Sequence, residues 1–454
     1  MSTIAAISTG MSPGGIGIVR LSGENALEIA DKVFSSKNGK LLSEIGGYHA
    51  LLGNAVDENK SPVDEVVALV YRAPKSYTGE DVVELNCHGG LFVTRQVLRL
   101  VLQAGAVPAE PGEFTKRAFL NGKMDLAKAE SVMNIISSHS QQEMKIALNT
   151  LEGALSKKIS QINQILISAS ASLQAWVDYP DDEIEELSNG ELVKNLNKAS
   201  DELENLISNF DSGKAVIGGV RTAIVGKPNV GKSTLMNLLL GEDRSIVTSL
   251  EGTTRDIVEE TAVIGSATLR LADTAGMRSS SDEVEQIGVD KAKKWLEGAD
   301  FVLAVFDLSR ELSDEDKEII NLVKNKKSVA ILNKTDLEEK ADRNSIIQNF
   351  SDYIFLSARN SEDRQALCEI IEKVLETANI DPSAASLINA RQLACCKSAL
   401  ENIRQALDDL ENGVTLDAVN VTIDSAIDEL LVLTGEKASD SVINEIFSRF
   451  CVGK

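Results

Sequence analysis

The chain has few aromatic residues, which make up only 4% of its 454 positions. A surface that stacks successive nucleic-acid bases needs aromatic side chains, so the composition disfavours an extended stacking platform. Positive charge is also scarce, because 46 Lys and Arg residues face 69 Asp and Glu residues and leave a net charge of −23. This balance argues against a general polyanion binder, while a small basic patch or a basic partner stays compatible with it.

CxxC motifs and long apolar runs are missing as well. The five cysteines show neither a CxxC pair nor metal-ligand spacing, and few scattered thiols in an acidic chain indicate a reducing environment. The first residues lack the pattern of a secretory signal, and apolar runs such as residues 301–306 are far below the ~20 residues that span a bilayer. We therefore expect a cytoplasmic protein without membrane insertion.

The patterns along the chain predict several domains, as its length requires. Residues 1–120 mix strand and helix patterns, which predicts an α+β domain. Residues 121–215 and 379–454 have helical periodicity, and one or two long helices are expected between 125 and 176. Residues 216–378 alternate strand and helix as a parallel sheet does. The fold class is thus multidomain α/β and α, with the α/β domain inserted between two halves of a helical domain.

A phosphate-binding loop is the clearest motif. Gly226-x-x-x-x-Gly231-Lys232-Ser233 lies between a β-branched run and an apolar helical face. In that context the backbone N–H groups can surround phosphate oxygens. Lys232 is expected to contact the β- and γ-phosphates, and the Ser233 hydroxyl to bind Mg²⁺.

Further motifs follow in the order that a GTPase needs. Asp273, in Asp-Thr-Ala-Gly, ends a strand and can hold Mg²⁺ through water, while the N–H of Gly276 can reach the γ-phosphate. Asp336, in Asn333-Lys-Thr-Asp, can accept two hydrogen bonds that guanine offers and adenine does not. Residues 357–359, Ser-Ala-Arg, would complete the base pocket.

The catalytic apparatus departs from the Ras-like pattern. Met277 stands where a Gln would orient the attacking water, so the water must be activated from elsewhere. The candidates are the downstream acids Asp282, Glu283 and Glu285. An arginine finger is not evident either. Its charge must come from a partner, a second copy of the domain or a metal ion, and Asn229 offers a side-chain oxygen to a monovalent cation.

From end to end, the chain resembles the MnmE (TrmE) family, bacterial GTPases that modify the wobble uridine of certain tRNAs. Beyond the GTPase motifs, the resemblance rests on stretches at 17–23 (GIVRLSG), 77–85 (YTGEDVVEL), 87–90 (CHGG), 111–115 (PGEFT), 117–127 (RAFLNGKMDLA), 273–278 (DTAGMR), 282–288 (DEVEQIG) and 450–454 (FCVGK).

The resemblance implies a folate-binding, dimerising domain at 1–120, a helical domain at 121–215 and 379–454, and a Ras-like P-loop GTPase domain at 216–378 with a mostly parallel sheet. Two GTPase domains would dimerise, with K⁺ in place of an arginine finger. Mg²⁺ would be bound by Ser233 and Thr254, and K⁺ by Asn229, Thr248, Leu250 and Thr253. The residues expected to contact GTP are Asn229, Val230, Gly231, Lys232, Ser233, Thr234, Thr248, Ser249, Leu250, Glu251, Gly252, Thr253, Thr254, Asp273, Thr274, Ala275, Gly276, Asn333, Lys334, Asp336, Ser357, Ala358 and Arg359.

The resemblance also implies the remaining roles. Glu285 would position the water and act with Lys232 and Asn229. Cys451 would have either a chemical role in modification or a packing role. A 5-formyl- or 5,10-methylene-tetrahydrofolate would bind Arg20, Glu84, Lys123 and Lys454.

The function that the motifs and the resemblance together imply is K⁺-dependent hydrolysis of GTP to GDP and phosphate. This hydrolysis would drive addition of an aminomethyl or carboxymethylaminomethyl group to carbon 5 of the wobble uridine of tRNA. A homodimer would work in a hetero-oligomer with the FAD-containing MnmG (GidA), and folate would give the one-carbon unit. The alternatives are a ribosome-assembly GTPase and a non-enzymatic GTP switch that needs an external activator.

Overall fold

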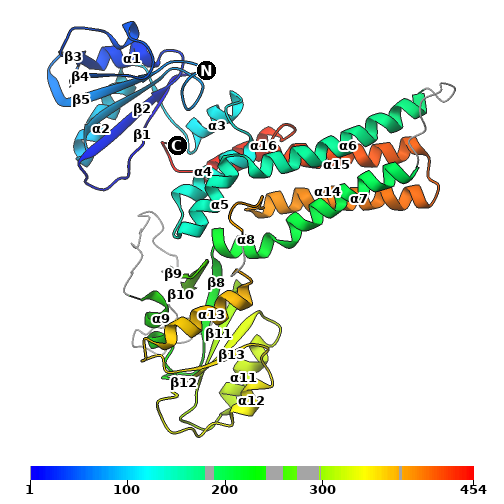
Figure 1. The fold of residues 1–454 in the computed structure, drawn as a ribbon. Coiled ribbons are helices and arrows are strands. Elements are labelled where there is room, and N and C mark those ends of the chain that lie inside the picture. Colours follow the sequence, from blue (N-terminus) through cyan, green and yellow to red (C-terminus); the bar gives the residue numbers. More distant parts are fainter. Residues whose placement is uncertain are drawn as a thin grey trace. The chain divides into compact units, whose positions relative to one another are not determined.

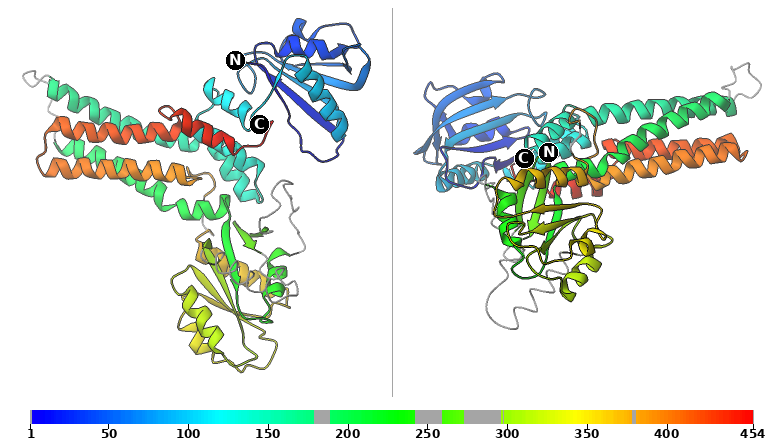
Figure 2. Two further views of the ribbon diagram at one scale, coloured as in Figure 1. Left: turned by 180° about the vertical axis from the view of Figure 1, so that it is seen from behind. Right: turned by 60° about the horizontal axis from the view of Figure 1, so that its bottom comes forward.

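The computed structural model describes residues 2–178, 189–241, 259–272, 296, 298–377 and 381–453. The chain forms two compact units, traced in Figures 1 and 2. Unit 1 comprises Met1–Met133 with Ile427–Lys454, and unit 2 comprises Asn134–Ala426. Among the described helices, none combines the length and the apolar character needed to cross a membrane.

Unit 1 is built on a seven-stranded sheet in the order β3-β4-β5-β6-β2-β1-β7. Helices α1 (Ala26–Val33) and α2 (Leu91–Gln103) cover one face, where Val66, Ala68 and Val70 are buried. The intervening Val67 points to the opposite face and is 38% exposed, as the alternation of a strand requires. The strands and the one short 3-10 helix among the described residues are β1 (Ile4–Ile7), β2 (Ile16–Ser22), β3 (Phe34–Ser36), η1 (Leu42–Glu44), β4 (His49–Val56), β5 (Pro62–Tyr71), β6 (Val82–His88) and β7 (Val107–Pro108).

The chain's two ends meet inside unit 1. Helices α3 (Glu113–Leu120) and α4 (Leu126–Ile136) meet α16 (Asp440–Ser448) near the C-terminus. Phe447 contacts Phe119 with ring centroids 6.3 Å apart. The sequence patterns did not predict α3, α16 or strand β4. Gly53 and Asn54 give the β4 segment the composition of a loop, and its strand pairing with β5 supplies what its own propensity lacks.

The helical part of unit 2 contains α5 (Gln141–Leu151), α6 (Ala154–Asp178), α7 (Asn189–Ser208), α8 (Phe210–Ile217), α14 (Ala390–Glu411) and the first part of α15 (Leu416–Thr434). Helices α6, α7, α14 and α15 lie side by side in Figures 1 and 2. Where one or two helices were predicted between 125 and 176, there are three: α4, α5 and α6. Gly153 (φ 97°) separates α5 from α6. The break also changes the buried face: α5 buries Ile146, and Met144 is 39% exposed.

In the α/β part of unit 2, the described residues form six strands in the order β13-β12-β11-β8-β10-β9. Strand β9 pairs antiparallel with β10, and the other pairings are parallel. All seven residues of β11 are buried, as expected of a central strand covered on both faces. The predicted fold class is confirmed. The elements are β8 (Val220–Val225), α9 (Lys232–Leu240), β9 (Glu259–Ile264), β10 (Ala267–Ala272), β11 (Phe301–Asp307), α11 (Asp314–Val323), β12 (Ser328–Asn333), α12 (Arg343–Ile347), β13 (Tyr353–Leu356) and α13 (Asp363–Leu375).

Candidate functional site

The phosphate loop connects the end of β8 to the start of α9, as predicted. Two of its glycines are required by both backbone angle and space. Gly226 has φ 156°, and a Cβ there would lie 2.5 Å from the Val305 carbonyl oxygen. Gly231 has φ 106°, and its Cβ would lie 2.3 Å from Nδ2 of Asn333. The loop therefore passes so close to the strand ends that side chains at these positions would displace it.

Lys232 begins α9 and turns back over the loop. Its ammonium donates hydrogen bonds to the carbonyl oxygens of Gly226 (2.6 Å) and Lys227 (2.7 Å). Ser233 and Thr234 follow in the first turn and are exposed. The positive charge, the hydroxyls and the N–H groups of the helix start are thus gathered at one loop, as binding of a phosphate requires.

Asn333 joins the phosphate loop to the loop after β13. Its Nδ2 donates to the Val230 carbonyl oxygen at 2.7 Å, and its Oδ1 accepts from the Ala358 N–H at 2.9 Å. The residue is 2% exposed, so both hydrogen bonds are shielded from water. One side chain therefore fixes the distance between two of the predicted GTP-binding segments.

The next residues place a carboxylate at the base-binding edge. Lys334 (φ 69°) pairs with Asp307 at 2.5 Å. Burial raises the pKa of Asp307, but hydrogen bonds from Lys334 and Ser309 outweigh it and leave the pKa below its usual value. The Ser357 hydroxyl donates to Asp336 and lowers the pKa of that carboxyl. Asp336 is therefore ionised at neutral pH and can accept two hydrogen bonds.

The sequence patterns did not reveal one anchor of the phosphate loop. Lys227, inside the loop, pairs with Asp316 of α11 at 2.5 Å and donates to the Ser313 hydroxyl at 2.9 Å. Asp316 is 3% exposed and also accepts from the Ser313 N–H. The signal was present as the Ser313-x-x-Asp316 spacing of a helix capping box, but nothing in it indicates the distant lysine.

In unit 1, the structure brings together part of the predicted folate-binding set. Arg20 and Glu84 are opposite each other on β2 and β6, and both Nε and Nη2 of Arg20 lie 2.8 Å from Oε1 of Glu84. The guanidinium carbon lies 5.9 Å and 5.7 Å from the ring centroids of Tyr77 and Phe114. The Gly453 carbonyl oxygen completes this cluster, 3.5 Å from Nη1 of Arg20. We call these five residues the tail site.

Two other predicted residues lie in the same unit. Lys123 donates to the Pro74 carbonyl oxygen at 2.9 Å, and its side chain passes Gly79, two residues after Tyr77. Cys451 is exposed, and its carbonyl oxygen accepts from the Gly112 N–H at 3.3 Å. The C-terminal segment is therefore held on the N-terminal domain by its backbone, which leaves the Cys451 thiol accessible.

Another group of the predicted residues lies outside the described part of the chain, so their roles stay predictions. They are Thr248, Ser249, Leu250, Glu251, Gly252, Thr253, Thr254, Asp273, Thr274, Ala275, Gly276, Glu285 and Lys454.

Solved structures of other proteins are similar to part of this chain. Era of Aquifex aeolicus bound to GDP and AlF₄⁻ is 28% identical, with a TM-score of 0.26, and the match covers 40% of this chain and 65% of that chain. The G domain of the T. maritima FeoB iron transporter is 25% identical, with a TM-score of 0.26, over 35% of this chain and 98% of that chain.

Sequence comparisons cover the full length. The model of the GTP-binding protein TrmE N-terminus matches residues 3–123, and that of the MnmE helical domain matches residues 126–451. The protein named tRNA modification GTPase MnmE from Lactococcus lactis subsp. cremoris (strain SK11) is 44% identical over 454 residues, covering 100% of this chain and 98% of that protein. The protein of the same name from Bacillus licheniformis is 41% identical over 459 residues and covers all of both chains. Because these relatives are 41–44% identical to the chain over its full length, the chain belongs to the MnmE family of tRNA modification GTPases.

Proposed function

We propose that the chain hydrolyses GTP to GDP and phosphate with the help of Mg²⁺ and K⁺, and that this hydrolysis drives modification of the wobble uridine of tRNA. The observation that supports GTP binding most strongly is the pair of buried hydrogen bonds made by Asn333. They hold the phosphate loop and the loop after β13 together. Nucleotide binding at the phosphate loop is therefore coupled to the position of the loop after β13.

Guanine selectivity comes from Asp336. Its ionised carboxylate accepts from N1–H and the 2-amino group of guanine. Adenine would leave the carboxylate unpaired, and that costs binding free energy.

The donor atoms near the loop suit both metal ions. The Ser233 hydroxyl, with Thr254, would hold Mg²⁺, which prefers hard oxygen ligands. Asn229 (φ 66°) is exposed in the loop and offers its amide oxygen to K⁺, with Thr248, Leu250 and Thr253 completing the set. The ion supplies positive charge where other GTPases use an arginine finger, a charge worth about 10³–10⁵ in rate.

Glu285 would position the attacking water, because Met277 has no polar group that could do so.

The tail site would bind a reduced folate. Glu84 offers a carboxylate to the donor edge of a pterin, and Tyr77 and Phe114 flank the Arg20 guanidinium. Lys123 and Lys454 would meet the glutamate tail of the folate. Cys451, with its accessible thiol, stands beside this site either as a reactant or as a packing residue.

A homodimer is supported by the face of the unit 1 sheet that α1 and α2 do not cover. Leu52 and Val67 are paired across β4 and β5 on this face and are 48% and 38% exposed, and Ile16 of β2 is 65% exposed. Apolar residues grouped on one sheet face favour burial against a second copy. The FAD-containing MnmG would be a further partner, and it would supply much of the basic surface that contacts tRNA, in keeping with the net charge of −23 of this chain.

The direct test of the hydrolysis mechanism is GTP turnover of the isolated protein with Mg²⁺ in KCl and in NaCl at equal ionic strength. We expect turnover in KCl to exceed that in NaCl by at least tenfold. Equal slow rates in both salts would contradict the cation-assisted mechanism.

A further inference from the structure

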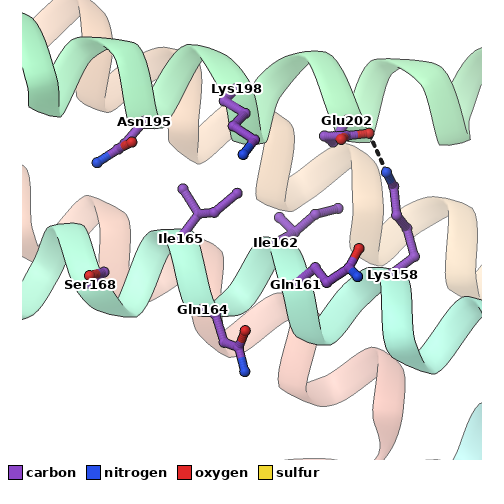
Figure 3. A pocket seen from close by; sticks show the side chains of 9 residues that line it. All are labelled: Lys158, Gln161, Ile162, Gln164, Ile165, Ser168, Asn195, Lys198 and Glu202. Atoms are coloured by element: carbon purple, nitrogen blue, oxygen red, sulfur yellow. Dashed lines mark hydrogen bonds and ion pairs between the residues drawn. The ribbon is translucent and has the colours of Figure 1, made fainter.

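A groove with a volume of about 540 Å³ lies between α6 and α7 in unit 2. Figure 3 shows Ile162 and Ile165 of α6 pointing toward α7, with polar side chains around them. Ile162 is only 1% exposed and closes the bottom of the groove. The lining residues are Lys158, Gln161, Ile162, Gln164, Ile165, Ser168, Asn195, Lys198 and Glu202.

The neutral lining is rich in hydrogen-bonding groups. Gln161, Gln164 and Asn195 each carry an amide that both donates and accepts. Within the described part of the chain, none of these three amides is engaged in a hydrogen bond with protein. They therefore remain available to an incoming ligand with mixed donors and acceptors.

The charged lining is positive in balance. Lys158 of α6 pairs with Glu202 of α7, as the dashed line in Figure 3 shows, so the one acid among the lining residues is neutralised. Lys198 is exposed, and no ion pair joins it to another residue that the structure describes. The groove thus presents a free ammonium beside a paired one.

Helix α6 itself is unusual for this chain. Its 25 residues contain Lys157 and Lys158 but a single acid, Asp178, at the very end. In the whole chain, 69 of 454 residues are acidic. The solvent side of α6 carries Ser and Gln instead, so a polyanion could approach α6 without the repulsion that most of the surface would exert.

We infer that this groove is a contact site for the phosphodiester backbone of tRNA. Lys158 and Lys198 contact phosphate oxygens, while Gln161, Gln164 and Asn195 hydrogen-bond to ribose hydroxyls or base edges. The site gives a strongly acidic protein one local surface that RNA can touch. The inference rests on the proposed role in tRNA modification, but RNA binding can be measured without GTP hydrolysis.

The test compares full-length proteins for binding of an in vitro transcribed tRNA across a salt series. The first variant is Lys158→Gln with Lys198→Gln. The second is Ser168→Glu, which places an acid in the groove and leaves the Lys158–Glu202 pair intact. The matched control is Lys324→Gln with Lys327→Gln, two exposed lysines of the same unit whose loss changes the net charge equally. GTP turnover without tRNA shows that each protein is folded.

We expect the double lysine variant to bind tRNA about tenfold more weakly. The slope of log K against log salt should also fall by about 0.7–0.9 for each phosphate that the variant no longer neutralises. Ser168→Glu should weaken binding as well, and the control should match wild type. Equal losses in the control, or none in either groove variant, would overturn the inference. A groove variant that no longer binds a protein partner but binds tRNA as wild type does would also overturn the inference. A wild-type protein that binds tRNA but does not turn over GTP would contradict the proposed function and leave the groove assignment standing.

Discussion

In unit 2, the phosphate loop joins a strand and a helix that are neighbours in the sequence, and its partner Asn333 ends another strand of the same sheet. In unit 1, the Arg20–Glu84 pair meets Gly453, which is 433 residues away from Arg20 along the chain. Short sequence motifs specify the first site. The second site depends on the contact of the C-terminal segment with the N-terminal domain. The two sites should therefore respond independently to substitution.

The largest expected effect is at the phosphate loop. Gly231→Ala combines a positive φ with a Cβ 2.3 Å from Asn333. Backbone strain costs about 1–3 kcal/mol, and displacement of a buried hydrogen-bonding group costs about as much again. We expect GTP affinity, measured by titration with a fluorescent analogue, to fall about 100-fold or more. Gly218→Ala is the control, because its φ is −89° and the nearest atom to the added Cβ is 3.5 Å away.

Asn333→Ala should have the next largest effect. It leaves the Val230 carbonyl and the Ala358 N–H without their partner, at about 1–3 kcal/mol for each buried group. GTP affinity should fall about 10- to 100-fold, while folate binding to unit 1 stays the same. Unchanged GTP affinity would show that Asn333 does not couple the two loops. Asn349→Ala is the control, since this amide donates to the Ser345 carbonyl at the surface.

The next prediction perturbs the tail site of unit 1 and leaves the nucleotide site unchanged. In Gly453→Ala, the Cβ would lie 2.2 Å from the Ile7 carbonyl oxygen, which should displace the tail from the sheet. We expect the affinity for 5-formyl-tetrahydrofolate, measured by calorimetry, to fall about tenfold, as for about 1–2 kcal/mol of strain, with GTP turnover unchanged. Gly413→Ala has a similar φ of 70° but no atom within 4 Å, so it separates backbone strain from crowding. Equal folate affinity in wild type and Gly453→Ala would show that the C-terminal tail is not part of the folate site.

Loss of the anchor behind the phosphate loop should have a smaller effect. Asp316→Asn removes the charge that holds Lys227 but keeps an acceptor for the Ser313 N–H. We expect KM for GTP to rise several-fold with kcat little changed, because the loop loses preorganisation rather than a group that contacts the reacting atoms. Asp314→Asn on the same helix breaks an exposed pair with Lys317 and should leave both constants alone.

The smallest effect concerns the exposed sheet face of unit 1. A hydrogen bond to Asp64 raises the pKa of His88 above its usual 6.5. The stabilisation from this pair is therefore fully present below about pH 6.5 and is lost as pH rises through the higher folded pKa. An NMR titration should show the pKa of His88 falling toward 6.5 in Asp64→Asn. An unchanged pKa would mean that the pair does not form in solution.

The same contrast explains how much the sequence predicted. The strand-loop-helix order around Gly226–Ser233 and the strand ends at Asn333 and Leu356 follow from local periodicity, so the sequence predicted the elements that carry these described residues. Lys227–Asp316 was missed because two surface-type residues reveal no pairing at a separation of 89 positions (316 − 227). Local sequence patterns likewise did not predict the contact between Gly453 and Ile7. Only the resemblance to the family indicated that the C-terminal tail reaches Arg20. Strand β4 was missed because pairing with β5, rather than its own composition, makes it a strand.

The central claim is that GTP hydrolysis by this chain drives modification of tRNA. The most direct measurement is mass spectrometry of wobble nucleosides in tRNA from a strain that lacks the protein, complemented with wild type, Gly231→Ala or Gly218→Ala. We predict that the carbon-5 modification is absent in the deletion strain and with Gly231→Ala, and restored by wild type and Gly218→Ala. Full modification in the deletion strain, or with Gly231→Ala, would contradict the account.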